Sequence, residues 1–105
     1  MKQYKVEITK EALQNMEDIN NYIANELLSP ENAMRQYDRI AGAILKLDIF
    51  PEKFRVLKSE REKQRELRRL VVDNYSVFYV ISEDRVIVTN VLYSASDIEK
   101  RLMEK

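Results

Sequence analysis

The sequence contains no cysteine and no histidine. The first absence excludes disulfides, thiol nucleophiles and thiolate metal sites, and it is typical of proteins in a reducing compartment. The second removes the usual general base and the commonest metal ligand. A single glycine also excludes the glycine-rich loops that cradle phosphates. Any catalysis would depend on Arg, Lys, Glu, Asp, Tyr and Ser, and we expect neither a metal nor an organic cofactor.

An excess of one charge and long apolar runs are absent as well. The 18 basic and 18 acidic residues cancel, so a site for a polyanion would need local clustering of charge. No segment approaches the ~18 apolar residues of a membrane span, and no apolar run predicts a secretion signal. With 105 residues, of which 45% are apolar, we expect one cytoplasmic domain over residues 1–105, with one modest core and no membrane partner.

Hydrophobic spacing divides the first half of the chain into a strand and two helices. Tyr4, Val6 and Ile8 alternate with charged residues, which predicts a half-buried strand over residues 1–8. Thr9 stands at an N-cap position. A helix over residues 10–28 is predicted from the apolar stripe Leu13, Met16, Ile19, Ile23 and Leu27.

A second helix follows the break at Ser29 and Pro30. Ser29 can cap this helix, and Pro30 suits its first position. Because the break is short, the helices should form an antiparallel hairpin that buries both stripes on a sheet. Pro51 ends the second helix, whose stripe is Ala33, Tyr37, Ile40, Ala41, Ile44 and Leu47. An irregular loop over residues 48–64 should be anchored by Phe50, Phe54, Val56 and Leu57.

The strongest β-forming region covers residues 65–93. Strands are predicted at 65–72, 75–81 and 86–93, with turns at Asp73-Asn74 and at 82–85. A capping box from Ser96 to Glu99 starts a short C-terminal helix. The predicted fold is α+β in the order β-α-α-β-β-β-α, with the N-terminal strand and the helix hairpin packed on a mainly antiparallel four-stranded sheet.

A local excess of basic residues begins at Lys53 and continues to Arg69. Such clustering can bind phosphates even in a neutral chain. The alternative is a solvated loop and a charged edge strand that discourages aggregation. The candidate nucleic-acid-binding residues are Lys58, Arg61, Lys63 and Arg65.

The candidate catalytic residues are Arg68, Arg69, Glu66 and Tyr93. Adjacent arginines cannot face the same side of a regular strand, so Arg68 and Arg69 should diverge. Glu66 could act as a general base beside Arg68, and a tyrosine could transfer a proton or stack on a base. The alternatives are a surface ion pair for Glu66, and a sheet face packed by Tyr75, Tyr79 and Tyr93.

Four segments in order resemble the RelE/ParE toxins of bacterial toxin–antitoxin pairs. They are DINNYIANELLSPENAMRQYDRI, IFPEKFRVL, LRRLVVDNYSVFYVI and VIVTNVLYSASDIEK. The resemblance covers nearly the whole chain and implies the same fold. Within it, Arg68 matches an arginine of the first strand of the meander, and Tyr93 matches a tyrosine or histidine at the end of the last. Ser76 stands where an arginine is expected, and the triplet Ser94, Ala95 and Ser96 stands where the family often has Gly-Arg-Arg.

The resemblance implies three alternative functions. The neutral charge, the missing histidine and the lost arginine donors favour a ParE-like toxin that arrests growth by binding a protein such as DNA gyrase. The basic stretch and Tyr93 favour a RelE-like ribosome-dependent mRNA endoribonuclease with a reduced basic site. The serines also suit a protein that has lost toxicity and only binds its antitoxin.

All three alternatives imply the same partner, a cognate antitoxin. We expect this antitoxin to compete with the tail helix, at Ile98, Leu102 and Met103. A homodimer and a hetero-oligomer with the antitoxin both remain open.

Overall fold

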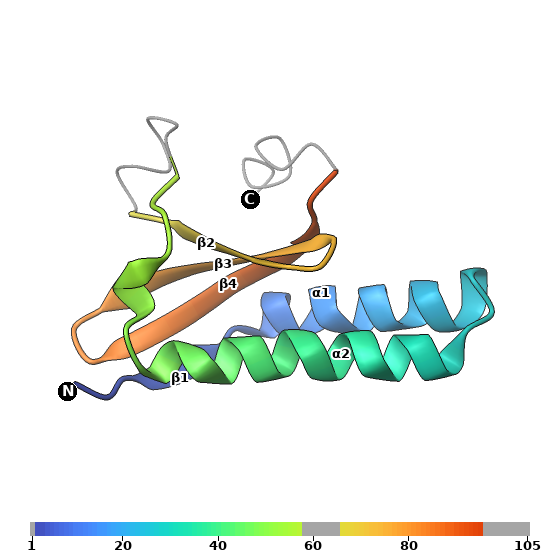
Figure 1. The fold of residues 1–105 in the computed structure, drawn as a ribbon, viewed down its shortest axis with the longest axis horizontal. Helices are drawn as coiled ribbons and strands as arrows, with labels where there is room; N and C mark the ends of the chain where they lie inside the picture. Colours follow the sequence, from blue (N-terminus) through green and yellow to red (C-terminus); the bar gives the residue numbers. More distant parts are fainter. Residues whose placement is uncertain (1, 58–65, 96–105) are drawn as a thin grey trace.

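The computed structural model describes residues 2–57 and 66–95, which form a helix hairpin on one face of a four-stranded sheet (Figure 1). The strand order is β1-β4-β3-β2, with β1 parallel to β4 and the other pairs antiparallel. The predicted α+β architecture is confirmed. The elements are β1 (Lys5–Ile8), α1 (Lys10–Asn21), α2 (Pro30–Leu45), β2 (Arg68–Val72), β3 (Tyr75–Ser82) and β4 (Arg85–Tyr93).

Two sets of predicted residues lie outside the described part of the chain. They are the basic residues Lys58, Arg61, Lys63 and Arg65, and the tail residues Ile98, Leu102 and Met103. The predicted C-terminal helix lies outside it too. Within residues 2–57 and 66–95, no helix is long and apolar enough to cross a membrane.

Polar side chains at the start of α1 fix the hairpin to β4. Thr9 caps the helix, its Oγ1 accepting the Ala12 N–H at 3.1 Å and donating to the Thr89 carbonyl at 3.2 Å. Asn15 Oδ1 accepts the Val91 N–H at 2.9 Å. Thr89 is the extra residue of a β-bulge, because Phe78 and Tyr79 on β3 pair across this point with residues 90 and 88 of β4. Bulged residues fall outside the regular ladder, so α1 supplies contacts at this irregular point.

The end of α1 departs from the predicted regular helix. Its last turn widens into the π-helical segment η1 (Tyr22–Glu26), and Leu28 then takes a left-handed backbone with φ 53°. Pro30 opens α2 as expected, but the predicted cap by Ser29 is wrong, because its side chain makes no capping hydrogen bond. Its carbonyl accepts the Ala33 N–H at 3.0 Å instead.

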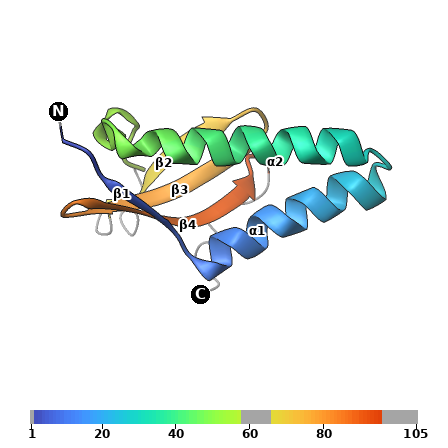
Figure 2. The same ribbon diagram turned by 90° about the horizontal axis from the view of Figure 1, so that it is seen from below.

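The core lies between the hairpin and the sheet, and the predicted stripes supply most of it. Two predicted members are exposed, Leu13 and Leu27. Ala12 occupies the core-facing position near Met16, and Leu27 lies at the far end of the hairpin, which projects past the sheet (Figure 2). The buried cluster includes Ala12, Met16, Ile40, Ile44, Leu47, Val77, Tyr79, Val86, Val88 and Val91.

The segment after α2 is anchored differently from the prediction. It contains the short 3₁₀ turns η2 (Lys46–Asp48) and η3 (Pro51–Lys53). Phe50, expected as an anchor, has φ 51° and is 56% exposed. Pro51 is buried in its place, because a left-handed residue turns the chain and directs the Phe50 ring to solvent.

Residues 55–57 cover one end of the outer edge of β2. The Arg69 N–H donates to the Arg55 carbonyl at 3.1 Å, and the Leu57 N–H donates to the Leu67 carbonyl at 2.8 Å. The strand itself begins at Arg68 rather than at residue 65, because Glu66 has φ 50°, which lies outside the β region. The loop is therefore part of the sheet edge.

Candidate functional site

Arg68 and Arg69 point to opposite faces of β2, as strand alternation predicts. On the helix side, Arg68 Nη1 donates to the carbonyls of Glu52 at 2.8 Å and Phe54 at 2.7 Å. On the other face, Arg69 Nε donates to Ser76 Oγ at 2.8 Å. Arg68 therefore holds the turn η3, while Arg69 is held by a neighbouring strand.

The face of the sheet away from the helices is built around a pair of serines. Ser76 is fully buried, and its Oγ lies 2.7 Å from Ser94 Oγ. Ser76 therefore contacts both Arg69 and Ser94. Ser76 stands where the family resemblance led us to expect an arginine, and Ser94 opens the triplet that replaces an expected Gly-Arg-Arg. Here the two serines link β3 and the end of β4 to Arg69. Buried apolar residues complete this face: Leu67, Phe78 and Leu92.

A hollow of about 390 Å³ is lined in part by Arg69, the arginine that contacts Ser76. Its lining combines two guanidinium groups with two apolar side chains. Arginine donors bind carboxylate or phosphate oxygens, so the hollow suits an anionic group carried on an apolar body. Arg55 was not among the predicted site residues, and its only signal in the sequence was the basic excess that begins at Lys53. The lining residues are Arg55, Leu57, Arg69 and Val71.

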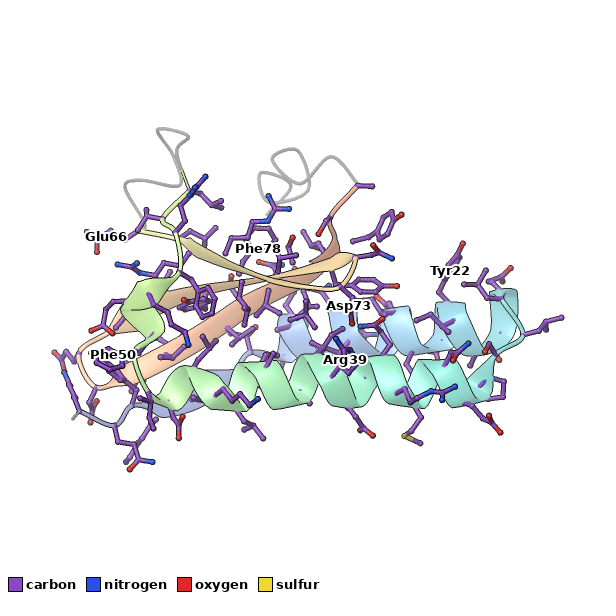
Figure 3. The ribbon with its side chains drawn as sticks, viewed as in Figure 1. Tyr22, Arg39, Phe50, Glu66, Asp73 and Phe78 are labelled. Atoms are coloured by element: carbon purple, nitrogen blue, oxygen red, sulfur yellow. The ribbon has the colours of Figure 1, made fainter. Side chains whose placement is uncertain are left out.

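Glu66 and Tyr93 lie at opposite ends of the sheet. Glu66 precedes β2, whereas Tyr93 pairs with Tyr75, beside the Val72 end of that strand. Extended residues rise ~3.3 Å each, which separates the two ends by roughly 15–20 Å. Figure 3 shows Glu66 at one end and Asp73, in the β2–β3 turn, at the other. The four predicted catalytic residues therefore do not converge on one point.

The tyrosines pack rather than line a proton path. Tyr75 and Tyr93 form an edge-to-face pair with ring centroids 5.8 Å apart. Burial raises the pKa of the Tyr75 phenol, and the nearby phenols of Tyr93 and Tyr22 raise this pKa further. Tyr79 is fully buried, its pKa is raised by burial, and its hydroxyl donates to the Pro51 carbonyl at 2.6 Å. Tyr75 and Tyr79 thus stay protonated at neutral pH.

A second polar group braces the turn η3 from the other side. The Tyr4 hydroxyl donates to Glu52 Oε2 at 2.7 Å. This hydrogen bond raises the pKa of Tyr4 and lowers that of Glu52. No group of three or more carboxylates in residues 2–57 and 66–95 is arranged to hold a metal ion.

Comparison with known families matches almost all of the chain. The model described as "ParE toxin of type II toxin-antitoxin system, parDE" matches residues 6–98. This chain belongs to the ParE toxin family. A comparison with curated protein sequences finds no match.

Solved structures share the fold of this ParE-family chain at low sequence identity. A chain of the chromosomal ParDE toxin–antitoxin system from P. aeruginosa has a TM-score of 0.73 and 14% identity, with 87% of this chain and 96% of that chain covered. A chain of the RelBE2 toxin–antitoxin complex from Mycobacterium tuberculosis has a TM-score of 0.60 and 17% identity, with 91% of this chain and 97% of that chain covered. A conserved hypothetical protein from Helicobacter pylori has a TM-score of 0.56 and 14% identity, with 89% of this chain and 97% of that chain covered. These similarities show the fold alone.

Proposed function

We propose that this ParE-family toxin arrests growth by binding a protein target, with DNA gyrase as the candidate, and that a cognate antitoxin neutralises it. The observation that carries the proposal is that both arginines of β2 form hydrogen bonds within the fold. Arg68 is bonded to loop carbonyls and Arg69 to Ser76, on opposite faces of the sheet. The family resemblance supplies gyrase as the candidate target.

Cleavage of RNA would require a different arrangement. A general base, a proton donor and a donor to the phosphate must lie within hydrogen-bond reach of the same reacting atoms. Here Glu66 and Tyr93 lie at opposite ends of the sheet, and Arg68 faces the helix layer. This arrangement supports binding over catalysis.

The antitoxin partner is inferred from the family and from its neighbours. The family is defined by toxins of type II toxin–antitoxin systems, and two structural neighbours come from ParDE and RelBE2 systems. We therefore expect a small antitoxin to bind this chain and block its activity.

The deciding experiment is controlled expression with and without the candidate antitoxin encoded beside the gene. We expect growth arrest that the antitoxin relieves, induction of the DNA-damage response, intact ribosome-bound message, and binding of the purified chain to purified gyrase. If expression leaves growth unchanged, the toxin has lost its toxicity and only the antitoxin-binding alternative survives.

One observation favours the ribonuclease as a second candidate. Arg55 and Arg69 line the same hollow and could contact one phosphate. If this is the mechanism, ribosome-bound message will be cut at fixed codon positions, and Arg55→Ala and Arg69→Ala will each abolish the cuts. Arg85→Ala is a matched control, because Arg85 forms an exposed pair with Glu7 on another edge of the sheet.

A further inference from the structure

We propose that the tip of the helix hairpin, residues 22–35, is the surface that contacts the protein target. The partner protein has an apolar pocket with a rim of lysine or arginine side chains. Leu28 of this chain enters that pocket. The inference rests on the proposed function, that the chain acts by binding a protein.

The tip is exposed and apolar. In Figure 1 the end of α1 and the start of α2 project past the sheet, so no strand of the described residues covers them. Four of the ten large apolar side chains that are exposed among the described residues lie in the tip, and Leu28 is the most exposed at 82%. The four are Tyr22, Leu27, Leu28 and Met34. A shallow hollow of about 420 Å³ is lined by Pro30, Met34, Glu31 and Arg35. Clustered exposed apolar side chains mark interaction sites more often than scattered ones do.

Leu28 combines this exposure with a strained backbone. It follows the C-cap residue Leu27 and has φ 53°, in the position where helices usually carry glycine. A Cβ is crowded in this conformation, so leucine is disfavoured there on conformational grounds. Its side chain is also 82% exposed, so burial among the described residues offsets little of the strain. Such strained residues cluster at binding sites.

The backbone around Leu28 is hydrogen-bonded in spite of this strain. The Leu27 N–H donates to the Tyr22 carbonyl at 3.2 Å, and the Ser29 N–H donates to the Ile23 carbonyl at 3.1 Å. These bonds span a widened π-helical turn, a geometry that is frequent at functional sites. These bonds therefore hold the backbone that presents Leu28 to solvent.

The charge of the hairpin selects the class of partner. Residues 13–35 carry four carboxylates and one arginine, Arg35, so this end of the hairpin is net acidic in a chain whose overall charge is zero. An acidic surface is repelled by the phosphates of nucleic acids, whereas it complements a basic protein surface. The partner of the tip is accordingly a protein with a basic rim. The four carboxylates belong to Glu17, Asp18, Glu26 and Glu31.

The test is Leu28→Gly, which separates binding from folding. Glycine suits φ 53°, so the urea midpoint of unfolding should hold or rise. Affinity for purified gyrase should fall at least about tenfold, which corresponds to about 1.4 kcal/mol, and growth arrest should weaken in parallel. Leu45→Ala is the matched control, because Leu45 is 65% exposed at the other end of α2 and should leave affinity and growth arrest unchanged.

Charge reversal gives an independent readout. Glu26→Lys combined with Glu31→Lys should weaken gyrase binding, and the affinity of the unmodified chain should fall with salt while that of the variant falls less. If Leu28→Gly binds gyrase and arrests growth like the unmodified chain, the tip is not the contact surface and the proposed function stands. If the unmodified chain neither arrests growth nor binds gyrase, the proposed function fails and this inference fails with it.

Discussion

Arg69 and Ser76 lie on neighbouring strands, with Arg69 Nε 2.8 Å from Ser76 Oγ. Ser76 is fully buried and also contacts Ser94 Oγ at 2.7 Å. An arginine at position 76 would place a second guanidinium against the first, where like charges repel. The serine instead provides an acceptor that fixes the Arg69 side chain against the sheet. Ser76, at the position of the expected arginine, therefore holds Arg69 in place.

Removal of the Ser76 hydroxyl should destabilise the fold. In Ser76→Ala the Arg69 guanidinium loses a buried acceptor, and hydrogen bonds to charged groups contribute about 1.5–3 kcal/mol. We expect the free energy of unfolding, measured by urea denaturation, to fall by about that amount. Ser82→Ala, at the end of the same strand, should change it by less than about 0.5 kcal/mol. Equal losses in both variants would contradict this role for Ser76.

Substitution of Arg68 should loosen the loop before it affects any activity. Arg68→Ala removes both hydrogen bonds to the Glu52 and Phe54 carbonyls, so the free energy of unfolding should fall by about 1.5–3 kcal/mol. The free energy of unfolding of Arg68→Lys should lie between those of the unmodified chain and Arg68→Ala, because an ammonium lacks the planar fork of donors.

Hydrogen exchange locates this effect. The amides of Leu57 and Arg69 join the loop to β2, and both should exchange faster in Arg68→Ala. If they exchange as in the unmodified chain, Arg68 does not hold the loop. A loss of growth arrest in this variant is evidence for catalysis only when these amides remain protected.

The elements of the fold were predictable because their signals are local. Period-two alternation predicted the first strand, and β-forming runs separated by turn residues predicted the other three. The helical stripes predicted both helices, although α1 ends at Asn21 and continues as the π-helical segment η1. The sequence did not predict which of two neighbouring apolar residues is buried. Hydrophobicity alone favours Phe50 as a loop anchor, but its left-handed backbone turns it outward and Pro51 is buried instead.

The candidate site was predictable only in part. Alternation along β2 correctly separates Arg68 from Arg69. The groups that each arginine meets come from other elements, 16 and 14 residues away for the two carbonyls of Arg68 and 7 residues away for Ser76. No local pattern encodes these contacts. The strain at Leu28 was likewise hidden, because a leucine at the end of a predicted helix indicates continued helix rather than a left-handed turn.

Acid should weaken the link between α2 and the β2–β3 turn. Arg39 binds Asp73 with two hydrogen bonds of 2.7 and 2.9 Å, and Gln36 adds one of 3.1 Å. These bonds lower the pKa of Asp73, and hydrogen bonding to Arg39 makes the largest contribution. Because the folded pKa is depressed, this stabilisation is present above the unfolded value of about 3.9 and is lost as the pH falls through the lower folded value.

Asp73→Asn should remove this part of the pH dependence. Asparagine tolerates the left-handed backbone of φ 55° at this position, so the turn is retained. We expect the free energy of unfolding of the variant to be lower near pH 6 and to decline less steeply below about pH 4. Asp84→Asn, in the other hairpin turn, should decline as the unmodified chain does. Parallel curves for Asp73→Asn and the unmodified chain would contradict the assignment.

Two tyrosine hydroxyls brace the turn η3, and their removal should differ in cost. Tyr79→Phe withdraws a 2.6 Å hydrogen bond from the carbonyl of Pro51, in a fully buried position where water does not replace the donor. An unsatisfied buried group costs about 1–3 kcal/mol, and we expect a loss in that range. Tyr4→Phe withdraws a bond from Glu52, whose exposed carboxylate can be hydrated, so this variant should lose less stability than Tyr79→Phe. Urea denaturation of both variants measures the difference. Equal losses would mean that water reaches the Pro51 carbonyl, and that the buried phenol contributes to this turn through packing alone.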